Sequence, residues 1–352
     1  MTGLAINGRF VGQRFSGVQR FATEITAAWA ALPDAPRPTL LLPAAAPNPP
    51  WPLPSERVGS RAGQLWEQAE LPRALRNRFL VNLGNTAPLL AGRHQAVVIH
   101  DAGVFDTPES YSRAFRTWYR LLHHGLAWRG ARILTVSEFS RGRIAHHLGL
   151  PPARIGVVGE GGEHILRDPA DLSVLAQYGL EPRRYALNVG NRAAHKNLGG
   201  QGPAAALLAQ RGLKLAAVGG GGAVFAGAEA AQGAAVIPLG RVSDAELRAL
   251  YENALCLIFP SRYEGFGLPP MEAFNCGCPV IAAQAGSLPE VCGDAALWFD
   301  PAKPATLAAA LTALLDTPTL AETLRQRGAA QAQRYTWRGG ARALLRHLEA
   351  SA

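Results

Sequence analysis

The sequence contains few of the features that mark secreted, membrane-spanning or zinc-binding proteins. It has 4 cysteines in 352 residues and no Cys-x-x-Cys pair, so reduced, buried thiols are expected in place of disulfides. No apolar run approaches the ~18 residues that a membrane-spanning helix needs. No charged segment followed by an apolar one opens the chain. These absences predict a cytoplasmic protein that touches a membrane at most from its surface.

Nucleic acid is an unsuitable partner despite the basic composition. The formal net charge is +9 and the pI is about 9.9, which suits an anionic membrane face or phosphorylated ligands as well as nucleic acid. However, the sequence has no zinc-finger spacing, no RNA-binding signature and no basic run interleaved with aromatic residues. Phosphorylated ligands and a membrane surface therefore remain as the partners that the charge favours.

Length and patterning indicate two α/β domains. The chain is too long for one ordinary core, and 48% apolar with 17% charged residues indicates a globular protein. Short apolar strands alternate with helical segments, which predicts parallel doubly wound sheets. We expect domains at 1–165 and 166–335, with a crossing in the polar, proline-bounded segment 166–182, and a final helix at 336–352. Within 33–55 only Leu40–Leu42 is expected as a strand.

The stretch 259–283 is the most informative part of the sequence. An apolar strand at Leu255–Phe259 leads into a loop with Gly265 and Gly267, followed by the Pro269-Pro270 start of a helix. A helix N-terminus at the open end of a parallel sheet presents unpaired N–H groups and binds anions, usually phosphate. The stretch therefore predicts a phosphate-binding loop.

Two carboxylates flank this loop. Glu264 precedes it, and Glu272 follows eight residues later on the expected helix. Taken alone, the pair is equally compatible with solvated charges on a loop and a helix. The complete run is more specific: it resembles the donor-binding signature of the retaining glycosyltransferases of family GT4, "PS-x-x-EGFGLPP-x-EA-x-x-CG-x-PV". The resemblance extends over nearly the whole chain and is strongest over 236–301.

The resemblance implies a GT-B fold, in which two Rossmann-like doubly wound domains face a deep cleft and the last helix returns to the first domain. The implied activity is transfer of a hexose, with mannose from GDP-mannose as one option, from a nucleotide-diphosphate sugar. The implied acceptor is a saccharide or a polyprenyl-diphosphate-linked saccharide in surface polysaccharide synthesis. The sequence has no Asp-x-Asp, the metal-binding pair of the other large glycosyltransferase fold, so neither a metal nor another cofactor is expected.

Position and resemblance together nominate the site residues. His100 and Asp101 follow the strand Val97–Ile99 at the mouth of a cleft, and the resemblance places both near the reacting sugar. Arg192 and Lys196 lie four residues apart after the strand Tyr185–Val189, and paired cations suit a diphosphate leaving group. By resemblance, Glu264 and the loop backbone hold sugar hydroxyls, and Glu272 holds the ribose. The further donor-binding candidates are Gly17, Arg241, Val242, Gly265, Phe266, Gly267 and Leu268, with Gly12 and Ser16 beside Gly17 in a glycine-punctuated first loop.

Several alternatives stay open. The aromatic and arginine-rich segment Ser112–Trp128 suits either an amphipathic membrane-facing helix or a core helix with an arginine-decorated solvent face. Gly159-Glu-Gly-Gly stands where the family usually has a Pro-Asn-Gly turn. A nucleotide-sugar epimerase of the same fold is the main alternative activity, and the complete Glu264/Glu272 and His100/Asp101 pairs argue against a non-catalytic sugar-nucleotide-binding protein. A nicotinamide oxidoreductase is opposed by the absence of Gly-x-Gly-x-x-Gly.

Overall fold

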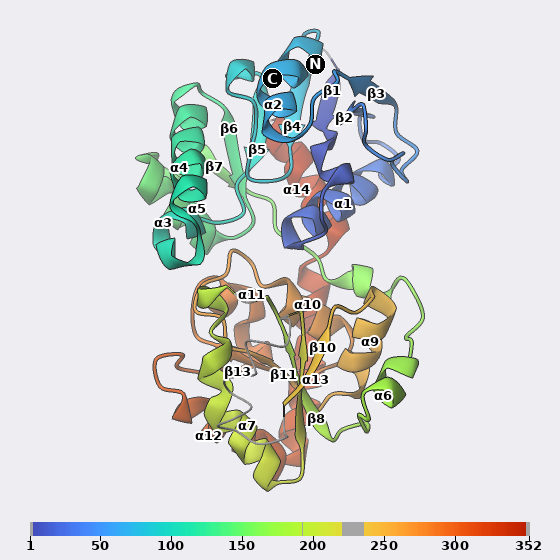
Figure 1. Cartoon of the computed structure of the whole chain (residues 1–352), viewed down its shortest axis with the longest axis vertical. Helices are drawn as coiled ribbons and strands as arrows, with labels where there is room; N and C mark the ends of the chain where they lie inside the picture. The colour runs from blue at the N-terminus through green and yellow to red at the C-terminus, as the bar shows by residue number, and fades with distance from the viewer. Residues whose placement is uncertain (1–2, 192, 220–235, 350–352) are drawn as a thin grey trace. The chain divides into compact units, whose positions relative to one another are not determined.

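The computed structural model describes residues 3–191, 193–219 and 236–349, which form two compact units (Figure 1). The first unit comprises residues 1–160 and 337–352, and the second comprises residues 161–336. Each unit is built on a parallel sheet covered by helices. The predicted α/β class with two doubly wound units is therefore confirmed.

The first sheet has seven parallel strands in the order β3-β2-β1-β4-β5-β6-β7. Its strands are β1 (Leu4–Asn7), β2 (Thr39–Pro43), β3 (Ser55–Val58), β4 (Phe79–Asn82), β5 (Gln95–Val98), β6 (Arg132–Thr135) and β7 (Ile155–Val157). The sequence analysis does not predict β3 and β4. The edge strand β3 is polar and half exposed, so it carries no apolar pattern, whereas β4 is a buried apolar run that the sequence analysis overlooks.

Helices cover both faces of the first sheet. They are α1 (Gly17–Ala30), α2 (Gly63–Leu65), α3 (Gly103–Asp106), α4 (Arg113–Trp128), α5 (Glu138–Leu148) and α14 (Trp337–Glu349). The apolar side of α4 packs Leu122 and Leu126 against Val97 and Ile133 of the sheet. The side chains of Ser112 and Ser137 cap α4 and α5, as is expected for serine at these positions.

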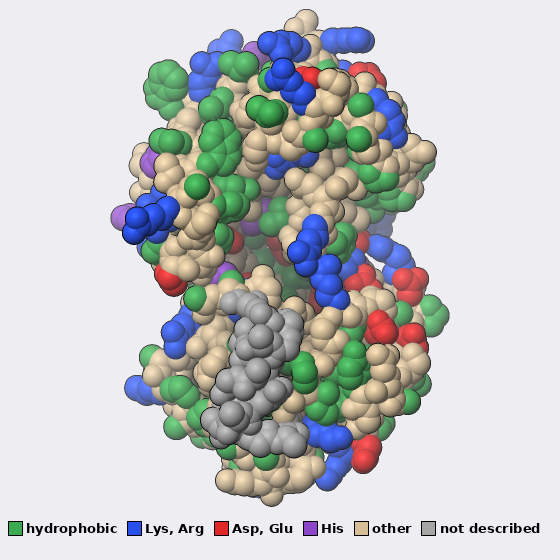
Figure 2. All heavy atoms as spheres, viewed as in Figure 1, with side chains coloured by type: hydrophobic (Ala, Val, Ile, Leu, Met, Phe, Trp, Pro, Cys, Tyr) green, Lys and Arg blue, Asp and Glu red, His purple; other side chains and the backbone are tan. Residues whose placement is uncertain are grey.

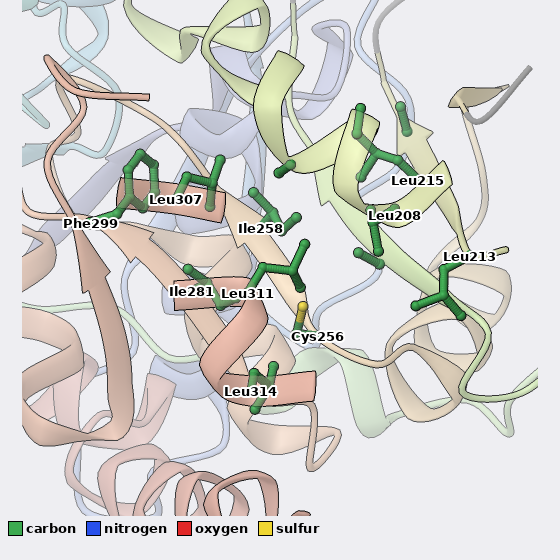
Figure 3. Packing of buried hydrophobic residues seen from close by; sticks show 14 of the residues in the cluster. Leu208, Leu213, Leu215, Cys256, Ile258, Ile281, Phe299, Leu307, Leu311 and Leu314 are labelled. Atoms are coloured by element: carbon green, nitrogen blue, oxygen red, sulfur yellow. The ribbon is translucent and has the colours of Figure 1, made fainter. Parts of the chain in front are cut away.

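The second sheet has six parallel strands in the order β10-β9-β8-β11-β12-β13. Its strands are β8 (Tyr185–Val189), β9 (Lys214–Val218), β10 (Val236–Gly240), β11 (Leu257–Phe259), β12 (Val280–Ala283) and β13 (Ala296–Phe299). The helices of this unit are α6 (Ser173–Gln177), α7 (Gly202–Gln210), α9 (Asp244–Asn253), α10 (Leu268–Asn275), α11 (Leu288–Cys292), α12 (Ala305–Asp316) and α13 (Pro318–Arg334). Figure 3 shows Leu208 of α7 and Leu311 of α12 packed against Ile258 and Ile281 of the sheet. The four cysteines are free thiols, as expected, although Cys276 is only half buried.

The chain passes from the first unit to the second earlier than the sequence analysis places the crossing. The division lies at 160/161, whereas 165/166 and a crossing within 166–182 are expected from composition. Residues 161–168 belong to the second unit because Arg248 of α9 donates hydrogen bonds to the carbonyls of Leu166 and Asp168, at 3.1 and 2.9 Å. The polar composition of 166–182 therefore marks a surface segment and not the linker.

The end of the chain returns to the first unit. The sequence predicts continuous helix over Leu320–Leu348, but the helix breaks at Tyr335-Thr336 between α13 and α14. The last helix packs along α1, and Trp337 contacts the ring of Phe21 edge-on at 6.1 Å between centroids (Figure 1). This helix starts at 337, one residue after the expected domain boundary at 335/336.

Candidate functional site

The candidate site of the second unit lies where its strand order reverses. Strands β8 and β11 are neighbours, although β9 and β10 lie between them in the chain. In an open α/β sheet, a crevice forms at such a switch point outside the carboxyl ends of the strands, because the two following loops diverge. The loop after β8 carries Lys196 and the loop after β11 carries Glu264. Both predicted residues therefore lie at the place where this fold binds ligands.

Lys196 and Glu264 form a direct ion pair. The distance between Lys196 Nζ and Glu264 Oε1 is 2.7 Å, and both side chains are more than four-fifths buried. Two further hydrogen bonds join the same loops, from Arg262 N to the His195 carbonyl at 2.8 Å and from Asn197 Nδ2 to the Pro260 carbonyl at 3.2 Å. The cation and the carboxylate are thus held in fixed positions, which lowers the cost of ordering them around a ligand.

The glycine loop before α10 has a fixed backbone. Gly267 has a φ of 109°, which glycine adopts without strain. Gly286 packs against the loop from behind, where a Cβ atom would lie 2.8 Å from the Glu264 nitrogen. The buried Ser287 hydroxyl donates to the Phe266 carbonyl at 2.8 Å. The side chain of Phe266 is itself buried and packs edge-on against Tyr335, so any contact of Phe266 with a ligand would come from its backbone.

The N-terminus of α10 has the features expected of an anion-binding end. Its N-cap is Gly267, which supplies no side chain to the first-turn N–H groups, and prolines occupy the first turn. Because Pro269 and Pro270 have no N–H, Leu268 is the one residue among the first three of α10 that offers a free backbone donor, and the helix dipole adds a partial positive charge there.

Glu272 is buried on α10 and both of its oxygens are engaged. Oε1 lies 3.1 Å from His164 Nε2, and Oε2 accepts a hydrogen bond from the Tyr251 hydroxyl at 2.9 Å. Burial, and secondarily the charge of Glu272, raises the pKa of Tyr251, so its hydroxyl remains a donor. The sequence analysis does not find His164 or Tyr251. No local pattern could identify them, because they lie 108 and 21 residues from Glu272 in the chain.

The remaining donor-binding candidates of the second unit lie farther from the β8 and β11 strand ends or outside the described residues. Arg241 and Val242 follow β10, which is two strands away from β8, and Arg241 is exposed. Arg192 lies outside the described residues. Among the described residues, no three histidine, cysteine, aspartate or glutamate side chains gather in a group that could hold a metal ion.

In the first unit, the neighbours His100 and Asp101 point to different surroundings. The His100 ring is buried, with Nε2 at 3.1 Å from the Leu83 carbonyl and Nδ1 at 3.4 Å from Glu160 Oε1. Glu160 belongs to the Gly159-Glu-Gly-Gly segment, and the sequence analysis does not connect it with His100. Asp101, in contrast, lines a cavity of about 530 Å³.

The first loop contributes unequally to this cavity. Ser16 lines it, whereas Gly12 ends a short helical turn and Gly17 begins α1, and neither glycine is part of the lining. Arg9 lines the cavity as well and is held from below by Glu67, a completely buried carboxylate 3.3 Å from its Nη1. In the segment around Glu67, Trp66 and Leu71 are buried, whereas Leu65 is two-thirds exposed.

The second unit matches a family of known proteins. The family described as "Glycosyl transferases group 1" matches residues 175–331, which span the ion pair, the glycine loop and Glu272. Residues 175–331 belong to this glycosyltransferase family. The match covers most of the second unit, and the family assignment confirms the resemblance found from the sequence.

Curated relatives of this glycosyltransferase family include bacterial mannosyltransferases. The chain is 35% identical over 253 residues to "O-antigen chain mannosyltransferase B" of Escherichia coli, which covers 68% of this chain and 65% of that protein. It is 41% identical over 100 residues to "MMP alpha-(1->4)-mannosyltransferase" of Mycolicibacterium hassiacum, covering 27% of this chain and 24% of that protein. The matched region thus spans less than two thirds of either relative.

Solved glycosyltransferase structures share the fold. "Sucrose-phosphate synthase (tll1590)" of Thermosynechococcus elongatus superposes with a TM-score of 0.77 at 20% identity over all of both chains. The Anabaena protein HepE, crystallised "in complex with UDP and glucose", superposes with a TM-score of 0.75 at 19% identity, also over all of both chains. At this identity the likeness shows the GT-B class of fold and nothing about substrates.

Proposed function

We propose that this protein is a retaining glycosyltransferase that takes a hexose from a nucleotide-diphosphate sugar bound to its second unit. The observation that carries the proposal is the 2.7 Å pair of Lys196 and Glu264 at the switch point of that sheet. A cation beside the N-terminus of α10 suits a diphosphate, and a carboxylate beside the cation suits sugar hydroxyls. The hydrogen bond between Lys196 and Glu264 also orients both side chains before the donor binds.

The leaving diphosphate is neutralised by side chains and helix dipole in this proposal. Lys196, the Leu268 N–H and the dipole of α10 stabilise the charge that develops on the departing phosphate oxygen. Arg192 is a further cation that the sequence contributes to this role. The sequence has no Asp-x-Asp, so we propose that transfer needs no metal or other cofactor.

Glu264 and Glu272 form hydrogen bonds with the two ends of the donor. Glu264 holds hydroxyls of the transferred sugar, while Glu272, aimed by His164 and Tyr251, holds the ribose hydroxyls. A carboxylate that is engaged by Lys196 and by sugar hydroxyls is poorly aimed at the anomeric carbon. We therefore favour attack by the acceptor on the same face as the departing phosphate over a covalent glycosyl-enzyme intermediate.

Mannose from GDP-mannose is the donor we propose to test first. The named relatives are mannosyltransferases of O-antigen and related saccharides, which supports a role in surface polysaccharide synthesis. The acceptor would then be a saccharide or a polyprenyl-diphosphate-linked saccharide.

We also propose a peripheral contact with an anionic membrane surface. In the part of the chain that the structure describes, no helix is long and apolar enough to cross a bilayer. However, one side of α4 exposes Trp118, Leu121 and Trp128, at 37%, 65% and 83%. Arginines flank this apolar side, and Figure 2 shows basic side chains interspersed with hydrophobic ones on the drawn face of the first unit. Tryptophan and arginine together favour an anionic lipid interface.

Thermal unfolding of the whole chain with GDP, UDP and ADP, and then with the matching mannose and glucose nucleotides, tests the donor proposal. A ligand that binds only the folded state at a hundred times its Kd stabilises it by about 2.7 kcal/mol. A rise in Tm with one nucleotide diphosphate, lost in Lys196→Ala, is the expected result. Absence of any shift would contradict the proposal, and loss of the sugar nucleotide without an acceptor product would favour an epimerase.

Sedimentation with vesicles tests the membrane contact. Vesicles containing phosphatidylglycerol should retain the protein and neutral phosphatidylcholine vesicles should not. The double variant Leu121→Glu/Trp128→Glu should lose retention while its nucleotide response is unchanged. Equal retention of this variant would exclude α4 as the contact.

A further inference from the structure

Another cavity of the first unit, the amino-end groove, lies where strands β4 to β7 begin. Its volume of about 710 Å³ falls within the ~300–1,000 Å³ usual for small-molecule sites. The segments that lead into these strands and the end of α14 supply lining residues such as Phe79, Arg93, Arg132, Arg154 and His347. The carboxyl ends of the sheet, where the strand order reverses between β1 and β4, carry the cavity that Asp101 lines. The amino-end groove is therefore a separate space at the opposite edge of the sheet.

Three arginines enter the amino-end groove from adjacent segments of the chain. Arg93 precedes β5, Arg132 opens β6 and Arg154 precedes β7. These three strands are direct neighbours in the sheet, and neighbouring strands lie ~4.8 Å apart. The loops before β5 and β6 also approach each other, since a Cβ atom at Gly130 would lie 3.8 Å from the Arg93 Cβ. The topology therefore brings three cations to one edge of the sheet.

Arg132 has a fixed position in the groove. Its Nη1 donates hydrogen bonds to the carbonyls of His347 and Leu348 at the end of α14, the second at 2.9 Å. Its guanidinium carbon lies 5.3 Å from the centroid of the Phe79 ring. The end of a helix carries only a partial negative charge, so this contact orients the guanidinium without neutralising it. Because a guanidinium has five N–H donors, Arg132 can hold α14 with one nitrogen and a ligand with the others.

The amino-end groove has a surplus of positive charge. None of the described residues that line it is acidic. Arg141 is paired with Glu138, whereas Arg93 and Arg154 are exposed and have no ion-pair partner in the described part of the chain. Burial lowers the pKa of Arg132, and no carboxylate offsets this effect. A partly buried guanidinium without a carboxylate gains stability when an anion binds beside it.

The wall that α14 contributes is closely packed. A Cβ atom at Gly156 of β7 would lie 2.8 Å from the His347 ring, so glycine lets this ring approach the strand. The ring is held by its Nε2, which lies 3.1 Å from the Val157 carbonyl. A groove with fixed walls loses little conformational entropy when a ligand binds.

We propose that the amino-end groove binds a phosphate group through Arg93, Arg132 and Arg154. The planar donors of a guanidinium match phosphate oxygens and bind them in pairs. This phosphate is distinct from the donor diphosphate, which belongs to the second unit in the proposed function. The same chemistry suits a soluble phosphorylated compound and the headgroup of an anionic lipid. Since Arg132 also holds the end of α14, binding links the ligand to the packing of the last helix on the first unit.

Isothermal titration of the whole chain with pyrophosphate and glycerol 3-phosphate tests the site at low ionic strength, where charges are screened least. At least one of these probes should bind, and Arg93→Ala/Arg154→Ala should weaken that binding at least tenfold. Both arginines are exposed, so this double variant should keep the Tm of the ligand-free protein. Lys196→Ala should retain the binding, because Lys196 belongs to the other unit.

The matched control is Arg61→Ala/Arg73→Ala. It removes the same charge from two exposed arginines of the first unit that do not line the groove, and it should leave the affinity within twofold of wild type.

Sedimentation with phosphatidylglycerol vesicles identifies the source of the phosphate. Retention that is lost in Arg93→Ala/Arg154→Ala but kept in Arg61→Ala/Arg73→Ala assigns the groove to a lipid headgroup. Unchanged retention together with weakened binding of the soluble probes assigns it to a soluble ligand. If the two double variants have equal affinity for the soluble probes and equal retention on vesicles, the proposal is wrong. Nucleotide binding is measured separately, so this result leaves the transferase proposal intact.

Discussion

The two units have the same strand-order reversal but different chemistry at it. In the second unit, the loops at the switch point carry a buried ion pair and a helix N-terminus without a side-chain cap. In the first unit, the loops at the switch point carry Arg9, Ser16 and Asn85, and the aromatic side chains of Phe115 and Tyr119 lie nearby on α4. The comparison teaches that the same topology can bring different side chains to the reversal, because the loops after the strands vary independently of the strand order.

Removal of Lys196 should produce the largest effect. In Lys196→Ala, we expect kcat to fall by about 10²–10³, because the developing negative charge on the leaving group loses its nearest described cation. The KM for the acceptor should change little. Steady-state kinetics with varied acceptor measure both, with Lys303→Ala, a three-quarters exposed lysine of the same unit, as the control. Equal losses in kcat and in acceptor binding would contradict the assignment of Lys196 to the leaving group.

Glu272→Gln should weaken donor binding by about ten- to a hundredfold, because hydrogen bonds to a charged group contribute roughly 1.5–3 kcal/mol. Tyr251→Phe should have a smaller effect in the same direction, since the carboxylate remains but loses one partner. Isothermal titration with the nucleotide diphosphate measures both, and Glu322→Gln on an exposed helix surface is the control. Unchanged donor affinity in Glu272→Gln would show that this carboxylate has a purely structural role.

Gly286→Ala should lower stability and nucleotide binding together. Gly286 has a φ of 61° and would place a Cβ atom 2.8 Å from the Glu264 nitrogen. Gly149 in the first unit has a φ of 64° with nothing within 4 Å, so Gly149→Ala should cost only the ~1–2 kcal/mol of left-handed backbone strain. Chemical denaturation and nucleotide titration of both variants measure the difference. If the two variants behave alike, crowding behind the glycine loop has no effect on the site.

The smallest expected effect is a pH dependence that comes from the first unit. Burial lowers the pKa of His123 from 6.5 to about 4, so the unfolded chain takes up this proton first as the pH falls. The contribution to the free energy of unfolding is complete above pH 6.5, and about 1 kcal/mol of it is lost between pH 7 and pH 5.5. His123→Gln should flatten this part of the stability curve. An unchanged slope would show that His123 titrates normally in the folded protein.

Much of the second unit could be predicted because its signals are local. Strand β8 has the predicted bounds, and the Ser243 and Glu246 capping box is present at the start of α9. The Glu264 loop and α10 also follow from adjacent glycines and prolines. Such signals need only neighbouring residues, since a turn or a helix end is determined within a few positions.

The predictions were weaker where distant segments meet. The sequence analysis misses strand β3 and the crossing at 160/161 because a polar edge strand and a linker depend on the neighbours they contact. The sequence assigns the neighbours His100 and Asp101 the same position near the reacting sugar. In the structure the histidine contacts Glu160 and the aspartate lines the cavity.

The sequence by itself determined the α/β class, most elements and the positions of the donor-loop carboxylates, because periodicity, glycine and proline act over a few residues. Only the tertiary structure decided that Lys196 pairs with Glu264, that His164 and Tyr251 hold Glu272, and that Glu67 lies beneath Arg9. These contacts join residues between 21 and 108 positions apart. The sheet topology brings side chains at such separations together, and a local sequence pattern does not specify that topology.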